Sequence, residues 1–183
     1  EWSKSREAEE DHPVLHRLSK LNRKTQSGAQ LSSQQPPHLA FGVNLIGYAR
    51  GQLGIGEDVR MAARALDESE IPFTIYNIEP GREVSQNDKS AQGFISDNLP
   101  YNTNIFCTTG IETARLAALY GSKLFDGRRS IGYWPWELPE FPLCWRHAYH
   151  LVDEIWASSR FTFEAFARSF NKPVRHMPMA VTV

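Results

Sequence analysis

The chain has 183 residues, of which 41% are hydrophobic and 22% charged, and this length suits one globular domain with a substantial core. The formal net charge of −1 gives no reason to expect nucleic acid or an anionic membrane as a partner. No apolar run approaches the roughly 20 residues that span a bilayer. Since the N-terminus also lacks the hydrophobic core of a signal peptide, we expect a cytoplasmic protein.

Residues 1–38 differ in composition from the rest and are rich in Ser, Gln, Lys and Arg. They allow one short amphipathic helix, because apolar residues recur at helical spacing, namely Val14, Leu15, Leu18 and Leu21. The remainder lacks the apolar surface that would offset its ordering entropy, so we expect a polar linker or extension. The folded domain is predicted to cover residues 39–183.

From residue 39 onward, short apolar runs alternate with amphipathic stretches. Leu39–Tyr48 is almost continuously apolar, which suits a strand buried on both faces. The next stretch carries apolar residues at helical spacing, namely Ile55, Val59, Ala62, Ala63 and Leu66. Further strands are predicted at Phe73–Ile78, Asn104–Thr108, Ser130–Trp134, Glu154–Ser158 and Val174–Met177. Further helices are predicted at Ile111–Tyr120, Glu140–Leu151 and Arg160–Phe170. This alternation predicts an α/β fold, a Rossmann-like doubly wound parallel sheet with helices on both faces.

In such sheets ligands bind outside the carboxyl ends of the strands, where each strand passes into its helix. The first junction has the glycine spacing G-x-x-G-x-G, which departs from the dinucleotide fingerprint G-x-G-x-x-G. Its candidate substrate-binding residues are Gly54, Ile55, Gly56 and Glu57. The glycines let a ligand approach the backbone closely, whereas Glu57 and Asp58 would repel a pyrophosphate. The loop therefore favours neutral, hydroxyl-bearing groups, unless both carboxylates simply complement the helix dipole.

The second junction, Tyr133–Pro139, combines aromatic, acidic and proline residues. Trp134 and Trp136 are expected to present their rings on the same side, where aromatic faces stack on the CH surfaces of sugars. Glu137 is the candidate catalytic residue, acting as a base or accepting hydrogen bonds from sugar hydroxyls. The alternative is that the tryptophans are packed in the core and Glu137 is only solvated.

The third and fourth junctions supply further candidates for substrate binding. Thr109 and Gly110 precede one predicted helix, and Arg160 begins another. The alternatives are structural: the hydroxyl caps the helix, and Arg160 forms an exposed salt bridge. The six histidines show no metal-ligand spacing, so we expect no metal site. Cys107 and Cys144 are both expected to be reduced and buried.

Some of these segments also carry a family resemblance, namely Gly42–Arg50, Leu53–Glu57, Tyr133–Pro139, Val152–Phe161 and Pro173–Val181. In their order and spacing they resemble a group of retaining glycosyltransferases of family 4, which have the GT-B fold. Many members of this group build bacterial cell-surface polysaccharides. The resemblance extends over residues 40–183.

The resemblance implies that the chain is the N-terminal, acceptor-side half of a glycosyltransferase that moves a sugar from a nucleotide-sugar to a glycan or glycolipid. Such an enzyme would work in the cytoplasm or at the inner membrane surface, without a metal or other cofactor. Gly54, Gly56 and Glu57 would lie on the loop that faces the transferred sugar. Many relatives have a histidine that contacts the donor sugar after the strand corresponding to Ser130–Trp134, where this chain has tryptophans and Glu137.

The nucleotide would bind chiefly to a C-terminal domain, expected after Val183, so the chain alone is expected to be inactive. Its exposed cleft near Leu53, Trp134 and Trp136 is expected to promote self-association. Two other readings remain open. One is a nicotinamide-type Rossmann domain that uses Gly54-Ile55-Gly56 and Glu79 for the dinucleotide, and the other is a non-catalytic module whose aromatic cleft binds a glycan or a partner chain.

Overall fold

The structure is a computed structural model that describes residues 39–181. The predicted extension 1–38, with its helix near residues 14–21, lies outside the described residues.

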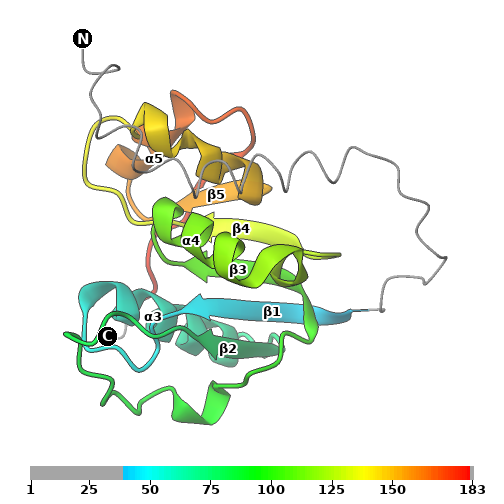
Figure 1. The fold of residues 1–183 in the computed structure, drawn as a ribbon. Coiled ribbons are helices and arrows are strands. Elements are labelled where there is room, and N and C mark those ends of the chain that lie inside the picture. The colour runs from blue at the N-terminus through cyan, green and yellow to red at the C-terminus, as the bar shows by residue number, and fades with distance from the viewer. Residues whose placement is uncertain (1–38, 182–183) are drawn as a thin grey trace, which may run out of the picture.

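A parallel sheet of six strands forms the centre of the domain (Figure 1). The strands are β1 (Ala40–Gly47), β2 (Phe73–Asn77), β3 (Tyr101–Cys107), β4 (Arg129–Tyr133), β5 (Glu154–Ala157) and β6 (Val174–His176). Their order across the sheet is β2-β1-β3-β4-β5-β6, and each neighbouring pair is parallel. Every strand predicted from the sequence is present, with boundaries shifted by a few residues.

The helices lie on both faces of this sheet (Figure 1). The helix α3 (Gly54–Glu68) packs on one face, while α4 (Gly110–Tyr120) and α5 (Arg160–Ala167) pack on the other. The strand order runs outward in opposite directions from β1 and β3, and right-handed crossovers then place the connecting helices on opposite faces. The prediction of a Rossmann-like doubly wound α/β sheet is confirmed at this level.

Three short 3-10 helices complete the described elements, namely η2 (Gln92–Phe94), η3 (Gly121–Leu124) and η4 (Leu143–Leu151). The last replaces the helix predicted at Glu140–Leu151 and starts later. Its start follows from Pro142, because the residue before a proline is disfavoured in helical backbone.

The core has two layers, one on each side of the sheet. Leu45 and Ile46 are both fully buried, Leu45 in the cluster beside α3 and Ile46 in the cluster beside α4 and α5. This confirms the prediction of a first strand buried on both faces. Cys107 is also fully buried, whereas Cys144 is exposed, so the prediction of two buried cysteines is wrong for Cys144.

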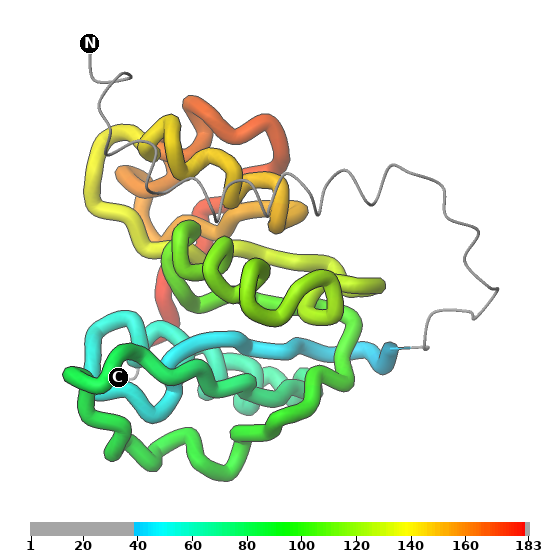
Figure 2. The backbone as a smooth tube through the Cα atoms, in the orientation of Figure 1, coloured from blue at the N-terminus to red at the C-terminus, as the bar shows by residue number. Residues whose placement is uncertain are grey.

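The two faces are covered unequally. After β6, the chain turns back across the face that carries α3 (Figure 2). There Met177–Ala180 and α3 border the same groove. The Met177 amide donates to the Ala157 carbonyl at 2.8 Å, which fixes the start of this return. Residues of β3, β4 and β5 line this groove between α3 and the returning segment.

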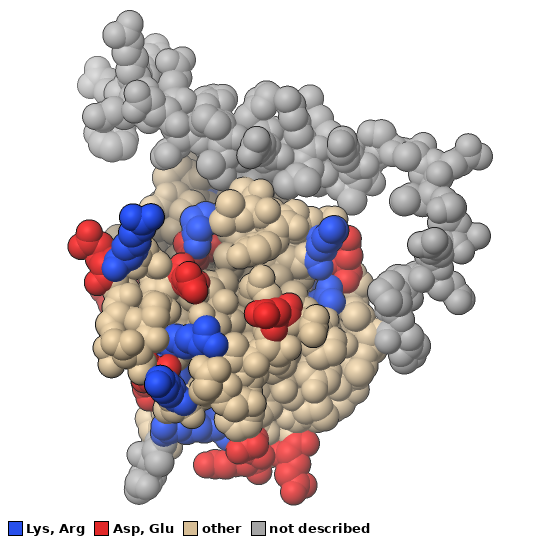
Figure 3. Space-filling view, turned by 60° about the horizontal axis from the view of Figure 1, so that its bottom comes forward, with Lys and Arg blue, Asp and Glu red and all other residues tan. Residues whose placement is uncertain are grey.

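Basic and acidic side chains are interspersed on the face shown in Figure 3, with wide uncharged areas between them. Among residues 39–181, no helix has the length and hydropathy needed to cross a membrane. Within the same range, no three His, Cys, Asp or Glu side chains come together in a way that could hold a metal ion.

Candidate functional site

The carboxyl ends of β1 and β3 mark the place where the strand order reverses, and the connections after them run to opposite faces. In open α/β sheets a ligand crevice forms at such a point. The loop after β1 (residues 48–53) and the start of α4 therefore border the first candidate site. The loops after β4 and β5 extend the same edge.

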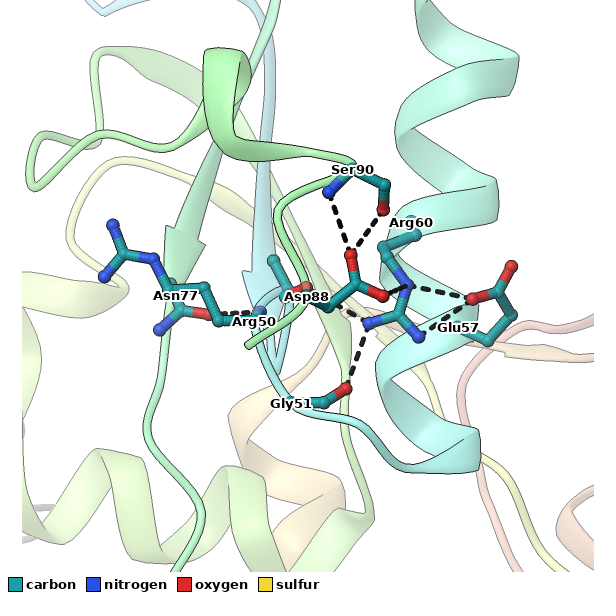
Figure 4. A network of polar contacts seen from close by, with 8 residues as sticks. Arg50, Gly51, Glu57, Arg60, Asn77, Asp88 and Ser90 are labelled. Carbon is teal, nitrogen blue, oxygen red and sulfur yellow. Dashed lines mark hydrogen bonds and ion pairs between the residues drawn. The ribbon is translucent and has the colours of Figure 1, made fainter. Parts of the chain in front are cut away.

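Arg60 holds the loop after β1 together from inside (Figure 4). Its Nη1 donates to the carbonyl oxygens of Ala49 at 3.1 Å and Gly51 at 3.0 Å. Its Nε donates to the Glu57 carboxylate at 2.8 Å and lies 3.5 Å from Asp88 Oδ2. The Arg60 side chain is only 7% exposed, so its charge is neutralised within the protein and is not presented to a ligand.

Asp88 brings the connection after β2 into the same network. Its carboxylate accepts hydrogen bonds from the Ser90 amide at 2.9 Å and the Ser90 hydroxyl at 2.6 Å. These bonds, together with the charge of Arg60, lower the pKa of Asp88. The Asp88 amide also donates to the Arg50 carbonyl, and the Arg50 amide to Asn77 Oδ1. The loops after β1 and β2 are thus joined into one rigid border.

The predicted residues of the first junction take different roles. A side chain at Gly56 would lie 2.5 Å from the Gly51 carbonyl oxygen, so this buried glycine permits close packing of helix and loop. Gly54 is exposed and a side chain there would meet nothing within 4 Å. Ile55 is half-buried and packs on the core. Glu57 is exposed beside Gly54, so these two remain the accessible candidates.

Tyr48 and α4 form the opposite border of the crevice. Burial raises the pKa of Tyr48, and its hydrogen bond to Glu112 adds to the effect. Burial of Glu112 acts to raise its pKa, but hydrogen bonds from Arg115 and Tyr48 hold that pKa below its usual value. Arg115 Nε donates to both Glu112 carboxylate oxygens at 2.9 Å. The carboxylate at this border is therefore ionised and already satisfied.

The prediction that Trp134 offers its ring to a ligand is wrong. Trp134 is 1% exposed, and its Nε1 donates to Thr113 Oγ1 at 3.0 Å. Its ring stacks with Phe141 and Tyr149 in the core. Gly110 makes room for that ring, since a side chain there would come within 3.1 Å of it. Gly110 is therefore required for packing against Trp134, and its predicted role in substrate binding stays a prediction.

Trp136 and Glu137 lie at the surface after β4. The Trp136 ring is half-buried, packs edge-on against Phe141 and Trp145, and donates from Nε1 to the Glu140 carbonyl at 3.1 Å. The Trp136 carbonyl accepts from Thr162 Oγ1 at 3.0 Å, which joins this loop to the start of α5. Glu137 is exposed and makes no hydrogen bond or ion pair with another described residue. It is a free carboxylate on a fixed backbone.

The third and fourth junctions are mainly helix caps. Thr109 Oγ1 accepts from the Glu112 amide at 3.2 Å and Ser159 Oγ from the Thr162 amide at 3.1 Å, which is the geometry of an N-cap. The structural alternative for Thr109 is confirmed. Arg160 is exposed and has no ion pair with any other residue in the described range, so the alternative of an exposed salt bridge is not seen there.

Sequence reasoning missed Arg60, Asp88, Tyr48 and Glu112 as members of this edge. The spacing of Glu57 and Arg60, three residues apart on a helix, was an available signal for that pair. No local signal connects Asp88 to Arg60, because the contact depends on how the loop after β2 folds over the loop after β1.

No protein-family model matches the chain, and neither a curated protein nor a solved structure does.

Proposed function

We propose that the carboxyl edge of the sheet binds hydroxyl-rich sugar groups, and that the chain is the acceptor-side domain of a GT-B glycosyltransferase. The observation that carries the proposal is the charge arrangement around Gly54 and Glu57. An exposed glycine and an exposed carboxylate stand at the reversal point of the sheet, while the nearby Arg60 is turned inward.

This arrangement favours hydroxyl groups over phosphate groups. A phosphate at the start of α3 would meet the Glu57 carboxylate. Arg60 already pairs with both Glu57 and Asp88, so the three side chains together keep one negative charge, which would repel a phosphate. Sugar hydroxyls can donate to that carboxylate and accept from backbone amides. The sequence resemblance to family 4 glycosyltransferases supports the same substrate class.

Trp136 and Glu137 supply the acceptor side of the proposed site. The exposed part of the Trp136 ring offers an apolar surface to a sugar, and Glu137 stands beside it without a competing partner. In the proposed reaction the bond from the donor sugar to its phosphate breaks and a bond to an acceptor hydroxyl forms. Glu137 takes the hydroxyl proton, and the nucleoside diphosphate leaves with the electron pair.

The proposal assigns nucleotide binding chiefly to a second domain, as in the family that the sequence resembles. We expect this chain alone to transfer no sugar and to bind nucleotide-sugars with dissociation constants on the order of 1 mM or weaker. Calorimetry with UDP-, GDP- and ADP-sugars measures this. Micromolar affinity for any of them would contradict the proposed division of roles.

The direct test is an NMR titration of the 15N-labelled chain with a set of oligosaccharides. Shifts should concentrate at Gly54, Glu57, Trp136 and Glu137, at saccharide concentrations on the order of 10 mM. Absence of shifts along this edge for every saccharide would overturn sugar binding.

Two other functions predict different outcomes when NAD and the Glu137→Gln variant are included in the NMR titrations. Tight binding of NAD with shifts around Gly54 would favour the nicotinamide reading. Saccharide binding that is unaffected by removing the Glu137 charge would favour a non-catalytic glycan-binding module.

Self-association through this edge and a place at the cytoplasmic membrane surface also remain proposals. The edge carries exposed apolar side chains that differ from those expected: Ile111, Leu138 and Phe161 are 42%, 57% and 50% exposed. Because exposed apolar patches tend to find another surface, we propose that a second copy or a glycolipid acceptor covers them.

A further inference from the structure

A groove of about 490 Å³ lies on the α3 face of the sheet. Its walls are α3 and the returning segment Met177–Ala180, and its floor includes Ile105, Ile131 and Trp156. The chain has three methionines, and all of them, Met61, Met177 and Met179, line this groove. Methionine side chains are flexible and polarisable and adapt to the shape of a bound apolar group.

The polar groups at one side of the groove are paired with one another. The Glu154 carboxylate accepts from Arg129 Nη2 at 2.6 Å, from Arg175 Nε at 3.3 Å and from Trp156 Nε1 at 2.6 Å. Burial acts to raise the pKa of Glu154, but these hydrogen bonds hold it below the usual value. Arg129 and Arg175 share this one carboxylate, so this side keeps one positive charge in excess, on guanidinium groups that are more than half exposed to solvent.

Asp58 and Tyr133 line the groove and lack such partners. Neither side chain makes a hydrogen bond or ion pair with another described residue. Burial, and to a lesser extent the charge of Glu57, raises the pKa of Asp58 to about 6, so the carboxyl is still ionised at neutral pH. The Tyr133 ring packs edge-on against Trp156, with centroids 6.3 Å apart.

We propose that this groove binds a small apolar molecule that carries one ammonium group, with the ammonium at Asp58 and the apolar body along the methionines. The volume lies within the range of roughly 300–1,000 Å³ typical of small-molecule sites, which are mostly apolar with few polar groups. Of the two carboxylates that line the groove, Asp58 is the one without an ion pair to a described residue, and aromatic faces such as those of Tyr133 and Trp156 attract cations. This site does not depend on the proposed sugar binding.

The test uses three probes with the same chain and different head groups: octylamine, octan-1-ol and octanoate. They are titrated into the full chain with 13C-labelled methionine methyl groups. Since every methionine lines the groove, the methyl spectrum reports binding there directly. We expect octylamine to bind most tightly and octanoate most weakly, with shifts at Met61, Met177 and Met179.

The variant Asp58→Asn should weaken octylamine binding by about tenfold or more, the value expected for a lost hydrogen bond to a charged group. Binding of octan-1-ol should stay within about twofold, since only the apolar wall holds it. The matched control is Asp67→Asn, an exposed carboxylate on the same helix that does not line the groove, which should leave all three affinities unchanged.

Equal binding of the three probes would overturn the proposal, since it would show a non-specific apolar surface. So would octylamine binding that survives in Asp58→Asn, or a spectrum that no probe shifts. Melting temperatures of both variants show that the fold is retained. A failure of sugar binding would leave these measurements unaffected, so the two proposals are tested separately.

Discussion

Arg60 shows how one buried side chain can determine what the surface around it offers to a ligand. Its hydrogen bonds to Ala49 and Gly51 hold the loop after β1, and its contacts to Glu57 and Asp88 compensate its charge. Removing a single partner from such a buried network costs more than the network contributes as a whole. Arg60 therefore positions the candidate site without being available to a substrate.

Glu137 differs from Arg60 because it has no partner to lose. We predict that Glu137→Gln changes the free energy of unfolding by no more than about 0.5 kcal/mol, as for an ordinary surface substitution. Saccharide affinity at the carboxyl edge should fall about tenfold, because a charge-assisted hydrogen bond is lost. Thermal unfolding and the NMR titration measure the two effects in one preparation.

The matched control for Glu137 is Glu140→Gln, an exposed glutamate on the same loop. It should change neither quantity. Unchanged saccharide affinity in Glu137→Gln would make Glu137 a solvated surface residue, and a large loss of stability would make it a structural one.

The ionised Asp58 carboxylate should lower the free energy of unfolding. This loss of stability should appear as the pH rises through the range in which Asp58 ionises. The pKa is raised from 3.8 to about 6 in the folded state, by burial and then by Glu57. The carboxylate therefore costs nothing below about pH 4, and its cost grows until about pH 6 and then stays constant. Tyr133 and Cys107, which face this region from β4 and β3, are neutral throughout, since burial raises the pKa of each.

We predict that Asp58→Asn raises the free energy of unfolding at pH 8 by up to about 1 kcal/mol, a value discounted for solvent screening of a partly exposed group. At pH 3.5 the variant and the parent chain should be equally stable, to within about 0.5 kcal/mol. Urea unfolding across this pH range measures the difference. A difference that does not change with pH would contradict the assignment, and Asp67→Asn serves as the control.

At the scale of elements, local sequence patterns predict the strands and most helices because these depend on neighbouring residues. Leu39–Tyr48 is apolar throughout because β1 is covered on both faces, and the stripe of α3 faces the sheet. The loops after the strands were predicted less well. Trp134 and Trp136 would share a side only if the strand continued, but β4 ends at Tyr133 and Trp134 turns into the core.

Gly110 and Gly54 both begin a helix, but Gly110 is packed against aromatic rings and Gly54 is open to solvent. Replacing each by alanine tests the effect of this difference on stability. We predict that Gly110→Ala costs about 1–3 kcal/mol of stability, because the new methyl group would press on the rings of Trp134 and Phe141. Gly54→Ala should be neutral or slightly stabilising, since the position is open and alanine favours a helix. Urea unfolding of the pair decides the matter, and equal costs would refute the packing role of Gly110.

At the scale of the whole molecule, the contacts that define both candidate sites join residues far apart in the sequence. Met61 lines the same groove as Met177 and Met179 only because the chain returns across the sheet after β6. Asp88 reaches Arg60 only because the loop after β2 closes over its neighbour. The periodicity of apolar residues says nothing about these two long-range arrangements. The sheet could therefore be predicted from the sequence, but the groove that it supports could not.

Cys144 and Cys107 differ in exposure, so the alkylation rate of Cys107 can measure how often the sheet opens. Cys144 is accessible to an alkylating reagent, whereas Cys107 sits at the end of β3 with no exposed surface. Iodoacetamide should modify Cys144 promptly and Cys107 only during rare excursions in which the central strands separate. We predict that Cys107 reacts more slowly by a factor on the order of 10³ or more, as expected for a marginally stable domain. In a Cys144→Ser variant, mass spectrometry measures the alkylation rate of Cys107 alone. Prompt alkylation of Cys107 would mean that the sheet opens far more often than its packing implies. Followed with and without octylamine, the same alkylation rate would also measure how much a bound ligand restrains those excursions.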